Sequence, residues 1–147
     1  MGTEIERKFT VLGDAWRSLG TALPIVQGYM THDKERVVRV RTAGDQGFVT
    51  FKGISIGAVR SEFEYEIPIA DARQILRELC FQPLIEKTRY RVPYQGMTWE
   101  VDEFSSPRHG LIIAEIELPS ADHRFEIPDW IGDEVTGDPQ YYNQNIR

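Results

Sequence analysis

Charged residues recur at every second position in several short segments of this chain, and this pattern restricts the folds it can adopt. Successive side chains of a β-strand point to opposite faces, so residues i and i+2 lie on the same face. The pairs are Glu4 and Glu6, Arg39 and Arg41, Glu62 and Glu64, Lys87 and Arg89, Glu100 and Asp102, and Glu115 and Glu117. The residues between them are largely apolar or aromatic, such as Ile5, Val40 and Phe63. Each segment is therefore predicted to be a strand with one ionic and one apolar face.

Several segments show period-2 alternation, and turn signals separate several of them. The candidate strands span residues 3–11, 25–31, 35–43, 47–53, 60–69, 86–94, 97–104 and 111–118. Connections such as 43–47 and 94–96 are too short for a parallel crossover, so they favour antiparallel neighbours. We expect a β-rich α+β fold, formed by residues 1–147 as a single domain.

Four segments are predicted to be helical, and all of them are short. Residues 71–80 carry apolar residues at helical spacing after Asp71, which is a candidate N-cap. Residues 14–20 form a short apolar turn, residues 120–126 begin at a capping serine, and residues 139–146 have a weak helical pattern. We expect a few short helices outside the sheet.

The rows of charge are nearly single-signed, and acidic and basic rows lie on different strands. Solvated outer faces of a sheet are one interpretation of any single row, but a surface that serves solubility intersperses the two signs. The other interpretation is that the rows converge on a common interior. Its basic members would be Lys8, Arg39, Arg41, Lys52, Lys87 and Arg89, and its acidic members Glu4, Glu6, Glu62, Glu64, Glu100, Asp102, Glu115 and Glu117.

Such an interior would need water, cations and an anion, because a dry cavity with these charges would be costly. Six basic and eight acidic side chains leave a net charge of −2, which two divalent cations would reverse. A linear triphosphate would then be attracted, and a barrel of about eight strands encloses only a small space. Carboxylates without His or Cys partners favour Mg²⁺ or Mn²⁺ over zinc, and arginines bind phosphate oxygens in bidentate fashion.

Composition limits the partners and the location of the protein. A net charge of −6 argues against a nucleic-acid partner, because contacts to a phosphate backbone need a basic face. No apolar run approaches the roughly 18 residues of a membrane span and no signal peptide is visible, so we expect a cytoplasmic protein. Cys80 is predicted to be a buried packing residue. Exposed aromatic residues such as Phe63 and Tyr65 would suit the partner subunit of a homodimer.

The motifs resemble, in their order, those of the CYTH or triphosphate tunnel metalloenzyme superfamily. Residues 4–8, EIERK, match the family's opening E-x-E-x-K. Further matches are Gln27-Gly28-Tyr29, Arg39-Val40-Arg41, Thr50-Phe51-Lys52, Arg60-x-Glu62-x-Glu64, Glu86-Lys87-Thr88-Arg89-Tyr90, Glu100-x-Asp102, Glu115-x-Glu117, and Glu134-Val135-Thr136 followed by Asp138 and Tyr141-Tyr142-Asn143. The resemblance covers nearly the whole chain. It implies an eight-stranded antiparallel β-barrel that forms a tunnel, dependence on a divalent metal ion, and action on a triphosphate.

The resemblance also implies roles for individual residues. The metal-ligand candidates are Glu4, Glu6, Asp102, Glu115 and Glu117, and the phosphate-binding candidates are Lys8, Arg39, Arg41, Lys52, Lys87 and Arg89. Three further acidic residues, Glu62, Glu64 and Glu100, would support the site. Family members are thought to activate the attacking water with a tyrosine–lysine pair at positions that match Tyr29 and Lys52. A lysine among other cations can act as a base, whereas packing near the barrel mouth is the alternative role for Tyr29.

Three functions stay open at this point. The short chain has no inserted segment that could hold a base or thiazole ring, which favours metal-dependent hydrolysis of inorganic triphosphate to pyrophosphate and phosphate. A nucleoside or thiamine triphosphatase, or a class IV type adenylyl cyclase, would share the fold. The third function is a non-catalytic module that binds polyphosphate or nucleotide. Such a module would need fewer carboxylates, so the acidic rows count against it. Similar short members continue through a helix that can plug one tunnel end, whereas this chain ends at Arg147. The sequence therefore leaves undecided how accessible the tunnel is.

Overall fold

The computed structural model describes residues 2–146, and within them the chain forms nine strands, one α-helix and three short 3₁₀ helices. The strands are β1 (Gly2–Val11), β2 (Thr21–Tyr29), β3 (Val37–Ala43), β4 (Gln46–Lys52), β5 (Val59–Ile67), β6 (Ile85–Tyr94), β7 (Met97–Ser106), β8 (Ile112–Glu117) and β9 (Ile131–Glu134). The helix α1 spans Ile69–Glu78, and the 3₁₀ helices are η1 (Ala15–Ser18), η2 (Pro139–Tyr141) and η3 (Asn143–Asn145).

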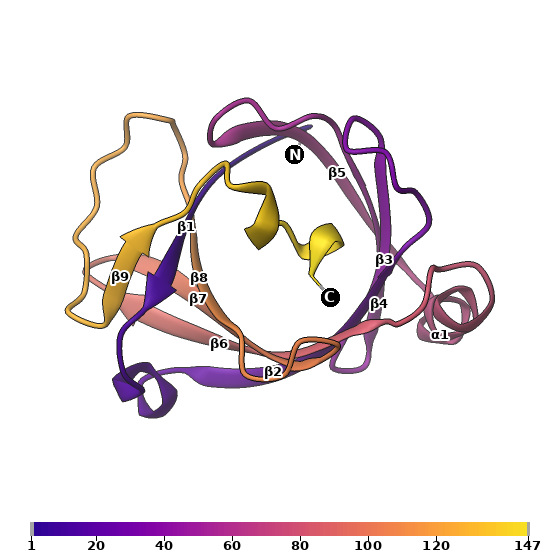
Figure 1. Cartoon of the computed structure of the whole chain (residues 1–147), viewed down its shortest axis with the longest axis horizontal. Helices are drawn as coiled ribbons and strands as arrows, with labels where there is room; N and C mark the ends of the chain where they lie inside the picture. Colours follow the sequence, from indigo (N-terminus) through magenta and orange to yellow (C-terminus); the bar gives the residue numbers. More distant parts are fainter. Residues whose placement is uncertain (1, 147) are drawn as a thin grey trace.

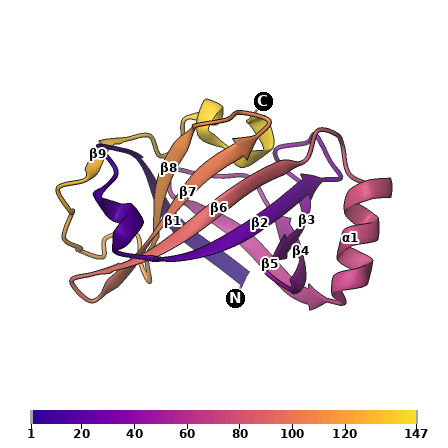
Figure 2. The ribbon, with the colours of Figure 1, turned by 90° about the horizontal axis from the view of Figure 1, so that it is seen from below.

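Eight antiparallel strands close into a barrel, which confirms the predicted fold class. Neighbouring strands follow the order β5-β4-β3-β2-β6-β7-β8-β1, and β1 also pairs with β5, so that the ring closes. Figure 1 looks down this ring, and Figure 2 shows the same strands from the side. The ninth strand, β9, pairs with β1 and lies outside the ring. Closure gives each barrel strand one inward and one outward face.

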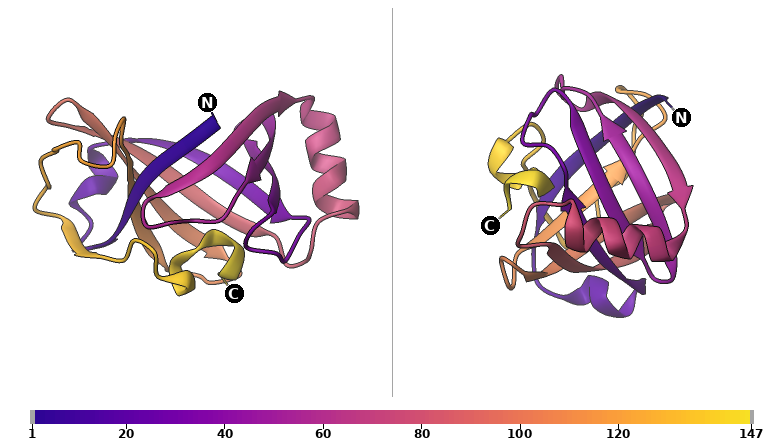
Figure 3. Two further views of the ribbon diagram at one scale, coloured as in Figure 1. Left: turned by 90° about the horizontal axis from the view of Figure 1, so that it is seen from above. Right: turned by 90° about the vertical axis from the view of Figure 1, so that its right-hand side faces the viewer.

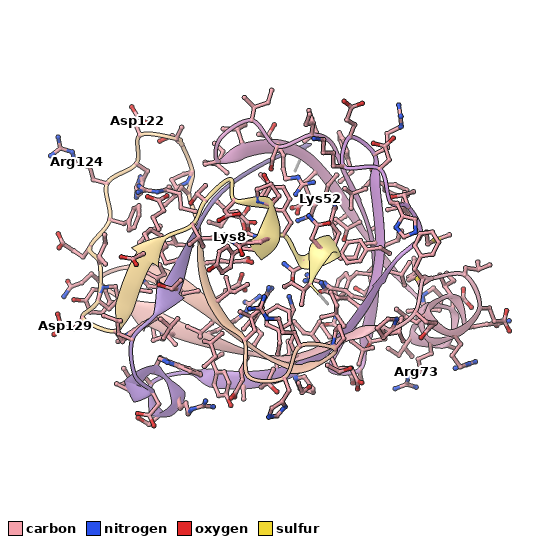
Figure 4. All side chains as sticks on the ribbon, viewed as in Figure 1. Lys8, Lys52, Arg73, Asp122, Arg124 and Asp129 are labelled. Atoms are coloured by element: carbon pink, nitrogen blue, oxygen red, sulfur yellow. The ribbon has the colours of Figure 1, made fainter. Side chains whose placement is uncertain are left out.

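The strand register places the charged rows on the inward face. Residues directly opposite each other in an antiparallel pair point to the same side of the sheet. Glu6 is paired in this way with Glu117 across β1 and β8. The labelled side chains of Lys8 and Lys52 lie inside the ring in Figure 4, whereas the labelled Asp122 lies on the outer surface. The interpretation of the charged rows as a common interior is therefore correct.

The largest hydrophobic core lies on the outer side of the barrel wall. Trp99 on β7 is 0% exposed, and its ring meets those of Phe9, Phe125 and Trp130 edge-on, at centroid distances of 5.4, 5.7 and 6.0 Å. Trp16 in η1 and Ile131 in β9 are buried in the same cluster. Each buried aromatic side chain removes about 150–250 Å² from water. The apolar contacts that stabilise the fold are thus made outside the ring, and the interior is left to the ionic side chains.

The helix α1 packs on the outside of β3 and β4 and forms a second apolar cluster, as the right-hand view of Figure 3 shows. A glycine permits this close approach, because a Cβ on Gly47 would lie 2.7 Å from the Cβ of Ala72. Cys80 is buried in the same cluster, as predicted, and burial raises the pKa of its thiol to about 11.

Two local predictions were wrong and one element was missed. Residues 120–126 are not helical: the Ser120 hydroxyl donates to Asp122 at 2.9 Å in a local turn, and Phe125 then packs on Trp99. The helix α1 begins before Asp71, with Pro68 at the N-cap position. The missed element is the strand β9, which is only four residues long and therefore too short to show an alternating pattern. It forms by pairing with β1.

No helix within residues 2–146 is long and apolar enough to cross a membrane.

Candidate active site

The barrel encloses a cavity of about 210 Å³ whose wall is almost entirely ionic. Seven carboxylates and seven cationic side chains line it: Glu4, Glu6, Glu62, Glu64, Glu100, Glu115, Glu117, Lys8, Arg39, Arg41, Lys52, Arg60, Arg89 and Arg91. Tyr29 and the C-terminal residues Tyr142, Asn143 and Gln144 complete the polar lining. The structure therefore brings together most of the residues that the sequence singled out.

Four residues differ from the predicted set. Lys87 and Asp102 do not line the cavity, whereas Arg60 and Arg91 do. The signal for the two missed arginines was present in the sequence, because each continues a row by one further step of two residues. Arg60 precedes Glu62 on β5, and Arg91 follows Arg89 on β6.

Carboxylates face one another across β1, β8 and β7. Glu6 is directly opposite Glu117, and Glu115 is directly opposite Glu100. Like charges in directly opposed positions destabilise a sheet. Burial, together with repulsion by Glu115 and Glu4, raises the pKa of Glu6 to about 8. We define Glu4, Glu6, Glu100, Glu115 and Glu117 as the acidic wall of the cavity.

Other members of the acidic wall differ in how far they are compensated. Burial also raises the pKa of Glu4 and of Glu117, and neighbouring glutamates add to the effect. Burial alone would raise the pKa of Glu115 as well, but Lys8 at 3.6 Å, with Arg89 and Lys87, lowers it to about 2. Glu115 therefore stays ionised more readily than Glu4, Glu6 and Glu117.

The basic wall, defined as Arg39, Arg41 and Arg89, faces the same cavity from β3 and β6. Arg39 and Arg41 share the Glu64 carboxylate at 3.4 Å each, and the Thr50 hydroxyl donates to that carboxylate at 2.7 Å. The Nε–H groups of Arg39 and Arg41 are buried without a hydrogen-bond partner within residues 2–146. Burial, with repulsion by Arg39 and Arg89, lowers the pKa of Arg41 to about 10. Unpartnered donors of this kind fit an anion.

Asp102 belongs to an ion-pair cluster behind the cavity wall. Arg89 donates through Nε to Oδ1 at 2.8 Å and through a terminal nitrogen to Oδ2 at 3.0 Å, and the Lys87 ammonium lies 2.8 Å from Oδ2. Burial opposes ionisation of Asp102, but the two cations hold its pKa well below the ordinary value. Both oxygens are occupied, so this geometry gives no support to Asp102 as a metal ligand. Asp102 instead fixes the orientation of Arg89.

Lys87 is fully enclosed in this cluster. Burial lowers the pKa of its ammonium to about 8, although Asp102 acts in the opposite direction. The ammonium donates to Oδ1 of Asn143 at 3.0 Å, which links the cluster to the C-terminal residues. Lys87 was predicted to contact phosphate directly, but in this structure it contacts the side chains that surround the cavity.

The Tyr29 and Lys52 side chains both line the cavity but are not hydrogen-bonded to each other within the described residues. The Tyr29 hydroxyl accepts from Nε2 of Gln27 at 3.1 Å. The Lys52 ammonium lies 3.2 Å from a carboxylate oxygen of Glu4 and 3.2 Å from one of Glu62. The nearest ionic partners of Lys52 are therefore two carboxylates, although six other cationic side chains line the same cavity.

The acidic wall offers oxygen ligands that fit a hard divalent cation. Across residues 2–146, no three His, Cys, Asp or Glu side chains are gathered closely enough to form a ready-made metal site. The fit lies in the chemistry of the donors: Glu6 and Glu117 are opposed like charges with raised pKa values, and a cation between them would relieve the repulsion. Carboxylate oxygens are preferred by Mg²⁺ and Mn²⁺.

Comparisons with known proteins agree on one family. Residues 2–143 match the model of the CYTH domain. An inorganic triphosphatase of Acetivibrio thermocellus is 54% identical over 146 residues, which cover 99% of this chain and 94% of that protein. An inorganic triphosphatase of Nitrosomonas europaea is 35% identical over 149 residues, covering 98% and 96%. A solved structure of an inorganic triphosphatase, 34% identical, superposes with a TM-score of 0.63 over 99% of this chain and 94% of that one.

The raised pKa of Glu6 predicts a pH-dependent effect of the substitution Glu6→Gln in metal-free protein. The folded-state pKa of about 8 exceeds the ordinary glutamate pKa of 4.5, so wild-type stability falls as the pH rises between these values. Glutamine imitates the protonated form and avoids this loss. Urea unfolding in EDTA should show the variant more stable than wild type by over about 1 kcal/mol at pH 9, and equal to it near pH 4.

The exposed residue Glu126 provides the matched control for this experiment. Glu126→Gln should change the free energy of unfolding by less than about 0.5 kcal/mol at either pH. A Glu6→Gln variant that is no more stable than wild type at pH 9 would contradict the assignment of unrelieved repulsion to this wall.

Proposed function

The chain belongs to the CYTH domain family, and on that premise we propose that it hydrolyses inorganic triphosphate to pyrophosphate and phosphate inside its barrel. One observation carries the proposal. Two arginines whose buried Nε–H groups have no partner within residues 2–146 line the same small cavity as the directly opposed carboxylates of Glu6 and Glu117, whose pKa values are raised. A substrate that is a polyanion and is bound together with divalent cations satisfies both walls at once.

The proposal assigns the phosphates to the cationic side chains of the cavity. Arg39 and Arg41, which line the cavity, would donate guanidinium N–H groups, and Arg89, oriented by Asp102, would present its remaining donors. Lys8 and Lys52 would contribute point charges, and Lys87 would act through the residues that it holds. Guanidinium groups suit this task because their planar donors match phosphate oxygens in pairs.

The proposal assigns the divalent cation, Mg²⁺ or Mn²⁺, to Glu4, Glu6, Glu115 and Glu117, with Glu62, Glu64 and Glu100 in support. When bound, such an ion neutralises phosphate charge and polarises the bond that breaks. The residues of the chain bind and orient the triphosphate between the two walls, so that its terminal phosphorus is exposed to water.

Hydrolysis requires that a water oxygen bonds to the terminal phosphorus while the bond from that phosphorus to the bridging oxygen breaks. The electrons of the broken bond leave with pyrophosphate, and the water gives up a proton. We keep Tyr29 and Lys52 as the pair that orients this water and accepts its proton. For Lys52 this role has a condition: only a neutral amine has the lone pair that accepts a proton, so the carboxylates of Glu4 and Glu62, which favour its ammonium, must first be drawn away from it, as a bound divalent cation would do. A homodimer and a cytoplasmic location stay predictions.

A panel of substrates tests the proposed function. We expect wild-type protein with Mg²⁺ or Mn²⁺ to release phosphate from tripolyphosphate with a higher kcat/KM than from ATP or thiamine triphosphate. Formation of cyclic AMP from ATP with Mn²⁺ would instead indicate a cyclase. Binding of tripolyphosphate without turnover would indicate a binding module. Equal efficiency on all triphosphates would contradict the proposed specificity.

The two walls predict different kinetic defects. Glu117→Gln removes a proposed metal ligand, so kcat should fall roughly 100-fold or more and the divalent-cation requirement should rise, with the fold preserved. Arg41→Ala removes charge-assisted hydrogen bonds to phosphate, so KM should rise about tenfold or more with an unchanged cation requirement. Steady-state kinetics over a range of Mg²⁺ concentrations measure both. Glu126→Gln is the control, and the assignment of the walls is wrong if both variants give the same pattern.

A further inference from the structure

The C-terminal segment, defined as residues 136–146, lies across one opening of the barrel. Figure 1 shows it within the outline of the ring, and Figure 2 shows it above the ends of the strands. It contains η2 and η3, and three of its residues, Tyr142, Asn143 and Gln144, line the ionic cavity. The segment therefore forms the wall of the cavity at this end.

This wall is fixed in place at both of its ends and in its middle. The backbone N–H of Lys8 donates to the Thr136 hydroxyl at 2.9 Å, and the Lys8 ammonium donates to the backbone carbonyl of Tyr141 at 3.3 Å. Lys87 holds Asn143. At the far end Ile146 is 5% exposed and belongs to an apolar cluster of the barrel wall. Polar and apolar contacts thus hold the segment across the opening.

Gln144 separates the ionic cavity from a second cavity of about 720 Å³ on the other side of the segment. Gln144 and Tyr29 line both cavities. Within residues 2–146, the Gln144 side chain makes no hydrogen bond, unlike its neighbours Asn143 and Asn145. The structure therefore defines Gln144 by its position between the two cavities and not by a polar contact of its side chain.

The second cavity has the chemistry of a site for a flat organic ring. His32 and Phe81 are stacked at its wall, with ring centroids 3.7 Å apart and planes 16° from parallel. Ile85 adds apolar surface. Gln27 is 0% exposed, and its Oε1 has no hydrogen-bond partner within the described residues. Aromatic faces stack on nucleobases, and an amide oxygen can accept from the exocyclic amine of adenine.

We propose that Gln144 determines substrate specificity by closing the passage between the ionic cavity and the aromatic cavity, so that unsubstituted triphosphate is accepted and nucleoside triphosphates are disfavoured. The proposal rests on the proposed function, because it assumes that the triphosphate chain occupies the ionic cavity. A nucleoside attached to the terminal phosphate at this end would have to pass Gln144. Beyond that side chain its base would meet the His32–Phe81 stack.

The substitution Gln144→Ala tests this inference by opening the passage. The ratio of kcat/KM for ATP to kcat/KM for tripolyphosphate should rise about tenfold or more, while the value for tripolyphosphate changes less than about threefold. Gln140→Ala is the matched control, because Gln140 is an exposed glutamine of the same segment that does not line either cavity. The control should leave the ratio unchanged. An unchanged ratio in Gln144→Ala would overturn the proposal.

A second variant tests the role of the aromatic cavity. Phe81→Ala, added to Gln144→Ala, should remove most of the gained activity on ATP, because the base loses its stacking partner. If the gain persists, the base does not occupy this cavity and the proposal fails. Should Gln144→Ala not fold, as judged by its thermal transition, Gln144→Asn shortens the side chain by one methylene and should give a smaller rise in the same ratio; no rise would overturn the proposal.

Binding measurements separate this inference from the proposed function. Calorimetric titrations with Mg²⁺ and the non-hydrolysable imido analogues of ATP and tripolyphosphate give the dissociation constants without turnover. We expect Gln144→Ala to lower the Kd for ATP about tenfold relative to that for tripolyphosphate. If wild type fails to hydrolyse tripolyphosphate but this shift in binding is seen, the proposed reaction is wrong and the role of Gln144 stands. If wild type hydrolyses tripolyphosphate but the shift in binding is absent, the proposed reaction stands and the role of Gln144 is wrong.

Discussion

Repulsion between opposed carboxylates inside the barrel is the constraint on which the rest of the structure depends. Glu6 faces Glu117, and Glu115 faces Glu100, on three adjacent strands. Such pairs are unfavourable in a sheet unless a cation lies between them, and burial makes the cost larger. Arg89 and Lys8 compensate the second pair, at 3.5 Å from Glu100 and 3.6 Å from Glu115, whereas Arg39 and Arg41 pair with Glu64 on β5 and leave the first pair, Glu6 and Glu117, with raised pKa values. The interior is thus arranged for a cation and an anion that arrive from solution.

An ionic interior obliges the chain to build its hydrophobic core elsewhere. Trp99, Phe9 and Trp130 pack on the outer side of β1, β7 and β8, and α1 covers the outer side of β3 and β4. This arrangement leaves the inward faces free to carry charge without loss of the apolar burial that stabilises a domain of this size. Buried ion pairs then set the geometry of the cavity wall, as Asp102 does for Arg89.

Most of the fold could be predicted from the sequence, because period-2 alternation is a local signal and eight strands carry it. The features that were missed depend on tertiary contacts. The strand β9 exists through its pairing with β1, and residues 120–126 form a turn and irregular chain from which Phe125 packs on Trp99. In the site, alternation identifies which residues face inward but not which of them reach the cavity. Lys87 and Asp102 face inward but form an ion pair with each other and do not line the cavity. Lys52 lies between two carboxylates, which the spacing of residues in the sequence could not indicate.

Diffraction from crystals grown with Mn²⁺ and tripolyphosphate tests the central claim most directly, because the anomalous signal of manganese locates the ion independently of any model of the protein. The account predicts Mn²⁺ inside the barrel, bound by carboxylate oxygens of Glu6, Glu115 or Glu117, with phosphate oxygens within hydrogen-bond distance of Arg39 and Arg41. Manganese and phosphate found only on the outer surface, with the ionic cavity filled by water alone, would contradict it.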